Sequence, residues 1–154
     1  MLDADRWQVA NFGVGAPNAG RNDDFDFDSL DNLLEFAFGT NPASGSSGLQ
    51  SLDYSGSFAG NGSILRTGLP ILRLEPVPTG VDNRILFVRR KDYVAAGLVY
   101  TPQYSSDLVT WVNGNSSAAV LADDGTLQIA SLPYLNFILG RRVRFFRLAV
   151  SLTP

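Results

Sequence analysis

Short apolar runs, bounded by proline, glycine and asparagine, recur between residues 64 and 154. In the last run the even-numbered residues from 146 to 152 are apolar and are expected to point inward, and the odd-numbered residues point outward. The Ala-Asp-Asp-Gly-Thr sequence at 122–126 is a good hairpin connection. Short strands at this regular spacing predict a mainly β fold, an antiparallel β-sandwich over residues 64–154 with Trp111 in its core. The earlier predicted strands are 69–75, 84–90, 98–104, 118–121 and 127–132.

A different period marks residues 21–42. Positions 30, 33, 34, 37 and 38 are all leucine, alanine or phenylalanine, which is the spacing of one apolar helix face. Gly39 suits the left-handed end of a helix, and Pro42 follows shortly after it. A helix of about two turns is too short to be stable alone, so we expect its apolar face to dock on a larger unit.

The segment 24–35, DFDFDSLDNLLE, carries the most specific chemistry in the chain. Acidic side chains occupy its first, third, fifth and twelfth places, the spacing of an EF-hand-type calcium loop. Calcium takes about six to eight oxygen ligands, so several carboxylates must converge on one point. The predicted cofactor is therefore Ca²⁺, held by a short calcium loop–helix at residues 21–42. The predicted ligands are Asp24, Asp26, Asp28, the carbonyl of Leu30, Asn32 and Glu35.

Two positions depart from that loop pattern. Ser29 stands at the sixth place, where glycine normally permits a sharp turn, and Asp31 stands at the eighth, which is usually aliphatic. The alternative interpretation is a solvated acidic turn that caps the helix, since carboxylates favour helix N-termini.

Two further segments flank the loop–helix. Residues 1–20 form an arm in which the apolar residues Trp7, Val9, Phe12 and Val14 change phase near residue 10, a pattern that fits a bulged strand. Such an arm is a possible donor strand for a neighbouring subunit. The alternative is an arm that packs on its own domain. Residues 43–63 are rich in glycine and serine, which is typical of a flexible linker or irregular loop.

Composition excludes several kinds of chemistry. The chain has 154 residues, no cysteine and no histidine. It therefore has no disulfide, no thiolate metal site and no Ser–His or Cys–His catalytic pair. The first ten residues lack the apolar segment of a signal peptide, so export would require a longer precursor. No apolar run is long enough to predict a membrane span.

Charge is unevenly distributed along the chain. Residues 1–60 hold nine acidic and two basic residues, a net charge of −7, and residues 61–154 hold ten basic and six acidic residues, a net charge of +4. The arginine-rich clusters at 89–91 and 141–147 allow a nucleic-acid interpretation. No nucleic-acid motif accompanies them, and solvated strand faces or salt bridges explain them better. We therefore expect no nucleic-acid partner.

Three motifs in order carry a family resemblance. They are NDDFDFDSLDNLLEFAFGTNP from residue 22, YTPQYSSDLVTW at 100–111 and RFFRLAV at 144–150. Together they resemble the C-terminal calcium loop and β-domain of many secreted proteins from Verrucomicrobia and related bacteria. Dockerin modules and thrombospondin type-3 repeats use similar loops. The resemblance implies an extracellular, non-catalytic module, and it carries the ligand roles onto Asp24, Asp26, Asp28, Asn32 and Glu35. Pro102 departs from the family's strand and suggests an edge strand.

These observations predict a calcium-stabilised structural or adhesive subunit that is extracellular or on the cell surface. It would associate with neighbouring subunits, and strand donation from the arm would build a filament.

A non-catalytic carbohydrate-binding module, with an extracellular polysaccharide as partner, is the alternative. Its candidate aromatic residues are Trp7, Tyr54, Tyr93, Tyr104 and Tyr134. An enzyme is not expected, because Glu35 and Glu75 are the only glutamates and no motif marks a catalytic carboxylate pair.

Overall fold

The computed structural model describes residues 3–46, 50–56 and 60–154, and the fold is mainly β, as predicted. Two short helices precede the strands. The helices and strands are α1 (Asp3–Phe12), α2 (Asn32–Phe38), β1 (Asp53–Ser55), β2 (Ser63–Arg66), β3 (Ile71–Val77), β4 (Gly80–Arg90), β5 (Leu98–Ser105), β6 (Val112–Asn113), β7 (Ala119–Asp123), β8 (Leu127–Pro133), β9 (Phe137–Ile138), β10 (Arg141–Arg142) and β11 (Phe145–Leu152).

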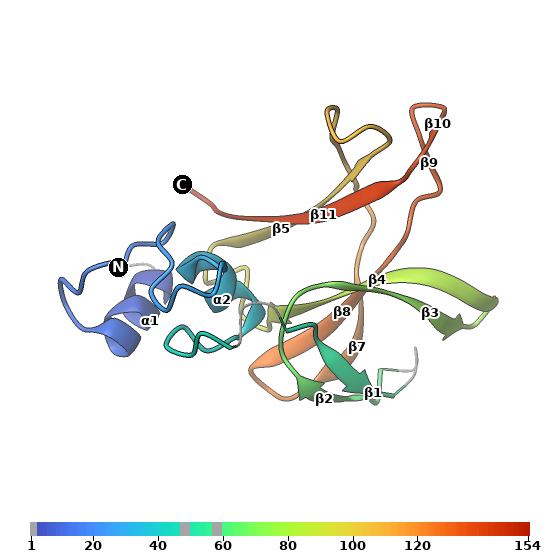
Figure 1. Cartoon of the computed structure of the whole chain (residues 1–154). Helices are drawn as coiled ribbons and strands as arrows, with labels where there is room; N and C mark the ends of the chain where they lie inside the picture. Colours follow the sequence, from blue (N-terminus) through green and yellow to red (C-terminus); the bar gives the residue numbers. More distant parts are fainter. Residues whose placement is uncertain (1–2, 47–49, 57–59) are drawn as a thin grey trace.

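The strands form antiparallel sheets stacked in layers (Figure 1). A three-stranded sheet has the order β11-β5-β6, and a four-stranded sheet has the order β3-β4-β8-β7. The β1-β2 pair lies on the other side of the four-stranded sheet, and β9 and β10 form a small hairpin. Strand β11 pairs with β5 over its whole length, from Phe145 opposite Ser105 to Leu152 opposite Leu98.

Strand β4 is buried on both faces, because it lies between two hydrophobic cores. Ile85 and Phe87 pack with Tyr104 of β5 in the core between the two larger sheets. The alternate residues Leu86 and Val88 pack in a second core beneath β1 and β2. Because successive side chains of a strand point to opposite faces of the sheet, the apolar residues of β4 contribute alternately to the two cores. The sandwich prediction is confirmed.

The predicted strands all occur, with ends shifted by at most four residues. The predicted hairpin connects β7 to β8, and the Asp124 carboxylate accepts from the amides of Thr126 and Leu127 at 2.9 and 2.7 Å. Strand β5 lies inside its sheet and not at an edge. Its Pro102 is tolerated because β6 pairs only with Gln103 and Tyr104, so no partner strand needs the missing N–H.

Trp111 is not in the core, contrary to prediction. Its side chain is half-buried on the surface, where the Arg147 guanidinium lies 4.2 Å from the ring centroid. The indole Nε1 donates to the carbonyl of Leu108 at 3.3 Å. The turn that carries Trp111 projects from the sheet, so the ring packs on the outer face of β11.

Residues 43–63 are not simply an irregular linker. They contain β1 and the start of β2, and Tyr54 of β1 is only 2% exposed. Its hydroxyl donates to Glu75 of β3 at 3.1 Å. Burial of one aromatic side chain and this hydrogen bond fix the segment on the sheet, although its composition favours a loop. The parts of the predicted linker at 47–49 and 57–59 lie outside the described residues.

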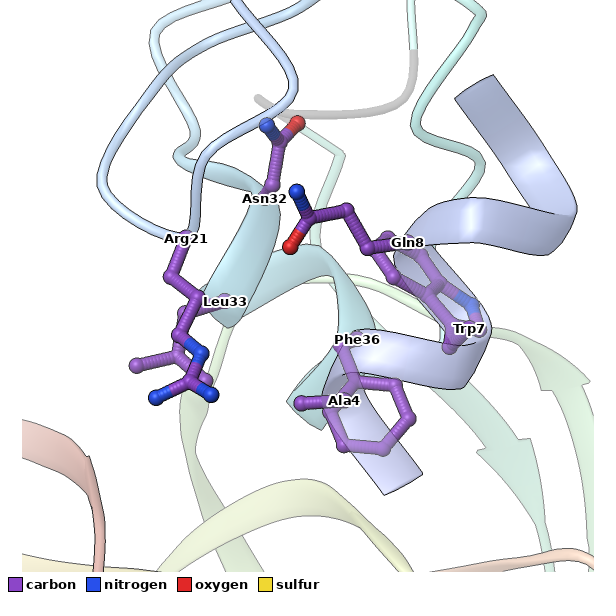
Figure 2. Close-up of a pocket in the computed structure, with 7 residues that line it drawn as sticks. All are labelled: Ala4, Trp7, Gln8, Arg21, Asn32, Leu33 and Phe36. Carbon is purple, nitrogen blue, oxygen red and sulfur yellow. The ribbon is translucent and has the colours of Figure 1, made fainter. Parts of the chain in front are cut away.

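The arm forms a helix, and the strand prediction for it is wrong. Ala4, Trp7 and Phe12 lie on one face of α1, and the Trp7 ring packs 5.4 Å from that of Phe36 in α2. Figure 2 shows Ala4 and Trp7 of α1 directed at Phe36 of α2. The helix ends at Gly13, whose φ of 83° suits glycine. Val9 and Val14 of the apolar pattern are exposed, and the arm packs on its own domain through Ala4 and Trp7.

Candidate metal centre

The acidic loop brings three carboxylates together in front of α2. Carboxylate oxygens of Asp24, Asp26 and Asp28 all lie within 4.8 Å of one another. The Asp24 carboxylate accepts from the amides of Asp28 and Ser29, at 3.1 and 2.8 Å, which curls the chain around it. Of the two intervening residues, Phe27 is exposed and Phe25 is half-buried against Phe12 of α1. Alternate residues therefore face one point, as the spacing predicts.

Two non-glycine residues in this loop have left-handed backbone angles. Phe27 has a φ of 62° and Ser29 a φ of 76°. Such a conformation costs about 1 kcal/mol or more for a residue with a Cβ atom. The sharp turn that glycine normally makes at the sixth place is thus made by Ser29 itself. Ser29 in place of glycine therefore makes the turn less favourable in energy, but the backbone still adopts the left-handed angle that the turn needs.

Asp31 begins the helix and takes no part in the carboxylate cluster. It has extended backbone angles, and its side chain accepts from the Leu34 amide at 2.9 Å, as an N-cap residue does. The predicted end at Gly39 is confirmed, with a φ of 66°. Capping therefore explains Asp31 and leaves Asp24, Asp26 and Asp28 without a capping role.

Glu35 arrives one helical turn after this cap and is fully buried, at 0% exposure. Thr40 Oγ1 donates to its Oε1 over a long 3.4 Å, and its Oε2 has no hydrogen-bond partner. Burial first, and then the charges of Asp26, Asp28 and Asp24, raise the pKa of Glu35 to about 8. The charges of the three aspartates therefore act on the fourth predicted carboxylate, although Glu35 is not part of the group whose oxygens lie within 4.8 Å of one another.

Asp26, like Glu35, has carboxylate oxygens that are buried without a hydrogen-bond partner. Neither of its carboxylate oxygens makes a hydrogen bond of acceptable geometry, although both are shielded from solvent. Burial, followed by the charge of Asp28, raises the pKa of Asp26, and the nearby amides of Asp28 and Ser44 only partly oppose this. Buried carboxylate oxygens without donors are costly unless a cation completes them.

Asn32 is placed by contacts that the sequence did not predict. Its side chain is 2% exposed, and its Nδ2 donates to the carbonyls of Asn18 and Gly20 at 3.0 and 2.7 Å. Its Oδ1 is buried and has no partner. These bonds hold the chain before the loop against the start of α2. No local sequence signal marks Asn18 and Gly20 as acceptors, because they lie more than ten residues from Asn32.

Leu30 has a buried side chain, and its amide donates to Asp28 Oδ1 at 3.0 Å. Coordination by its carbonyl stays a prediction. A second contact missed from sequence joins α1 to the loop, where Arg21 Nε and Nη2 both donate to Asp5 Oδ1 at 3.2 and 2.5 Å. A cavity of only about 10 Å³ remains between α1 and α2, with Arg21 and Asn32 in its wall (Figure 2).

The donor set fits a hard cation. Asp24, Asp26 and Asp28 supply carboxylate oxygens that lie close together, and Glu35 Oε2 and Asn32 Oδ1 are further buried oxygens without a hydrogen-bond partner. Oxygen-only sites of this kind suit Ca²⁺ or Mg²⁺ and do not suit metals that prefer nitrogen or sulfur. A bound cation would give the orphaned oxygens of Asp26, Asn32 and Glu35 a partner and would remove the repulsion within the cluster.

The remaining candidate residues are part of the packing. Tyr54 and Tyr104 are buried, at 2% and 1% exposure, and Trp7, Tyr93 and Tyr134 are half-buried against the cores. The five rings form no exposed row for a sugar chain. Neither described helix is long and apolar enough to cross a membrane.

Comparison with protein-family models, with curated proteins and with solved structures found no match to this chain. The function is therefore argued from the site itself.

Proposed function

We propose that this chain is a calcium-stabilised extracellular structural or adhesive subunit. The observation that carries the proposal is Glu35, a fully buried carboxylate with an unpartnered oxygen beside three other carboxylates. A cation explains this arrangement physically, and the loop spacing favours Ca²⁺ over Mg²⁺, which requires a tighter octahedral shell.

The ion's role would be to hold the loop in the shape that presents α2. Helix α2 joins the loop to the sandwich, because Phe36, Ala37 and Phe38 pack in a core with Leu98. The Tyr100 hydroxyl of β5 donates to the Ala37 carbonyl at 2.7 Å. Stabilising the loop therefore stabilises the attachment of both helices to the β-sheets, which couples metal binding to folding.

An extracellular setting suits this chemistry. Calcium sites in extracellular modules work at about 10⁻⁴–10⁻³ M ion, so a loop with a strained turn still fills there. A module that an ion holds rigid would serve well as a building block or an adhesive unit. Self-association with neighbouring subunits belongs to the proposal. Because the arm is helical and packed on α2, the contact between subunits would be made by other surfaces than a donated strand.

The test is thermal unfolding together with size measurement, in calcium and then in excess chelator, with magnesium as the control ion. At a free calcium concentration of 100 times the dissociation constant, the expected stabilisation is about 2.7 kcal/mol. For a domain of this size that corresponds to a rise in Tm of roughly 5–10 °C. A rise with calcium-dependent assembly supports both halves of the proposal. A rise in a particle that stays monomeric limits the ion to internal stabilisation, and an unchanged Tm overturns the calcium site.

A further inference from the structure

A separate hollow lies between the two larger sheets, away from the acidic loop. Its volume is about 340 Å³, within the range of small-ligand pockets. The segment that joins β6 to β7 crosses from one sheet to the other and forms one wall (Figure 1). The lining residues are Phe87, Arg89, Tyr93, Tyr100, Pro102, Ser116, Ser117, Ala118 and Leu132.

Arg89 supplies the charge of this hollow. Its side chain is half-buried, and it follows Ile85 and Phe87 on the face of β4 that points between the sheets. Its Nε donates to Gln128 Oε1 at 3.0 Å, and its guanidinium lies 4.7 Å from the centroid of the Tyr93 ring. Among residues 3–46, 50–56 and 60–154, no carboxylate lies within ion-pair distance of Arg89.

The two basic residues that follow Arg89 in the chain both pair with carboxylates. Arg90 pairs with Asp92 at 3.0 Å, and Lys91 pairs with Asp123 at 3.0 Å. A guanidinium that is partly removed from water and lacks a carboxylate retains donors suited to a planar, two-oxygen acceptor. The contact with the Tyr93 ring holds the guanidinium in place and leaves its charge uncompensated.

The other polar groups of the hollow are hydroxyls. Ser116 and Ser117 lie in the crossing segment, and their hydroxyls can donate or accept. Tyr100 is already engaged, because its hydroxyl accepts from the Arg90 amide at 3.3 Å and donates to the Ala37 carbonyl. Phe87, Pro102 and Leu132 add an apolar wall. The chemistry thus combines one cation, two hydroxyls and a surface for an aliphatic ring.

We propose that this hollow binds a small carboxylate that also carries hydroxyl groups, the chemistry of an acidic sugar such as a uronic acid. Arg89 would pair with the carboxylate, and Ser116 and Ser117 would bond the ligand's hydroxyls. The inference is independent of the calcium site, since no residue is shared between them. It would give a structural or adhesive subunit a contact to an acidic polysaccharide.

The test titrates the full chain in calcium with D-glucuronate, D-glucose and acetate, and follows the methyl signals of Ala118 and Leu132 by NMR. Glucuronate should bind, and glucose and acetate should each bind at least about tenfold more weakly, because each lacks one half of the recognised chemistry. Equal response to glucuronate and glucose would overturn recognition of the carboxylate. Equal response to glucuronate and acetate would reduce the site to a simple anion contact and overturn the sugar assignment.

Variants locate the contact. Arg89→Gln should weaken glucuronate binding by about tenfold or more, whereas Arg144→Gln, the same charge change at an exposed arginine, should leave it unchanged. Ser117→Trp, at an exposed position on the rim, should abolish binding without lowering Tm. Equal losses in the two arginine variants, or full binding by Ser117→Trp, would place the response elsewhere and overturn the proposal. Failure of this test leaves the calcium result unaffected.

Discussion

The two glutamates of the chain are both buried, and their surroundings are opposite. Glu75 of β3 is 1% exposed and has a cation, because Arg73 Nε lies 3.1 Å from its Oε1. The Tyr54 hydroxyl donates to its other oxygen at 3.1 Å. Burial first, and then this hydrogen bond and the charge of Glu75, raise the pKa of Tyr54 to about 12. Glu35 is 0% exposed and is surrounded by three more carboxylates.

The difference shows what each site lacks. The β3 site contains its own cation, so its charge is balanced without an ion from solution, although Glu75 Oε1 makes no hydrogen bond of acceptable geometry. The α2 site has four acidic groups, and among the described residues no basic side chain forms an ion pair with Asp24, Asp26 or Glu35. Burying like charges is costly, so such a cluster implies either bound protons or a bound cation. At the calcium concentration of the proposed extracellular setting a bound cation would be the better partner, because one ion can be shared by several carboxylates.

The largest expected effect comes from Glu35→Gln. In calcium this variant should lose about 2–3 kcal/mol of stability, because a ligand with two carboxylate oxygens becomes an amide with one acceptor. In chelator it should be as stable as the wild type or slightly more stable, because one buried like charge is gone. Thermal unfolding in both conditions measures this. An equal loss in calcium and in chelator would show that Glu35 has a packing role only.

Calcium should remove the pH dependence of stability that Glu35 causes in chelator. In chelator, the pKa of Glu35 is raised from 4.5 to about 8, so the folded state binds its proton more tightly than the unfolded state. This stabilisation is complete below about pH 4.5 and is lost as pH rises towards 8, a change of about 2 kcal/mol after allowance for solvent near a surface loop. In saturating calcium, stability should instead be nearly independent of pH between about 5.5 and 8, because the bound ion keeps Glu35 ionised in the folded state and this carboxylate is ionised in the unfolded state as well.

Denaturant unfolding between pH 5 and 8, in calcium and in chelator, gives the two slopes directly. Glu35→Gln should flatten the slope in chelator. Parallel slopes in both media would separate Glu35 from the metal site, even if calcium raises the Tm.

A smaller effect, without calcium dependence, is expected for Glu75→Gln. The amide keeps an acceptor for the Tyr54 hydroxyl and loses the charge that faces Arg73. Because the Arg73 side chain is 42% exposed, solvent screens much of this pair, and the loss should be about 1 kcal/mol. The same value in calcium and in chelator is expected. A calcium-dependent loss would mean that the two glutamates are coupled, and that Glu75 is not independent of the metal site.

The sequence predicted the β-sheets well because their signal is local. Alternation along β11 and the Asp-Asp-Gly turn before β8 are readable from neighbouring residues, and the loop spacing predicted the convergence of Asp24, Asp26 and Asp28. The sequence did not reveal α1, because its apolar face becomes recognisable only when Trp7 packs on Phe36 of another segment.

Strand β1 was missed for a similar reason. Its position depends on one residue, Tyr54, that binds Glu75 from 21 residues away within a glycine-rich segment. The support for Asn32 by Asn18 and Gly20 is also non-local. Local periodicity thus predicted the elements and the ligand spacing, and contacts distant in sequence determined how the site is held.

The smallest effect concerns the turn that shapes the site. Ser29 holds a φ of 76°, where a Cβ atom is unfavourable and glycine is not. Ser29→Gly should remove about 1 kcal/mol of strain and lose about half of that to the greater freedom of the unfolded chain. The net gain should be roughly 0.5 kcal/mol in chelator, measured by denaturant unfolding, and calcium affinity measured by calorimetry should increase or stay equal. Ser46→Gly, an exposed serine without a positive φ, is the control and should show no gain. A loss of calcium affinity in Ser29→Gly would show that the strained serine turn itself positions the carboxylates, and that the loop differs from the glycine pattern in its function as well as in its sequence.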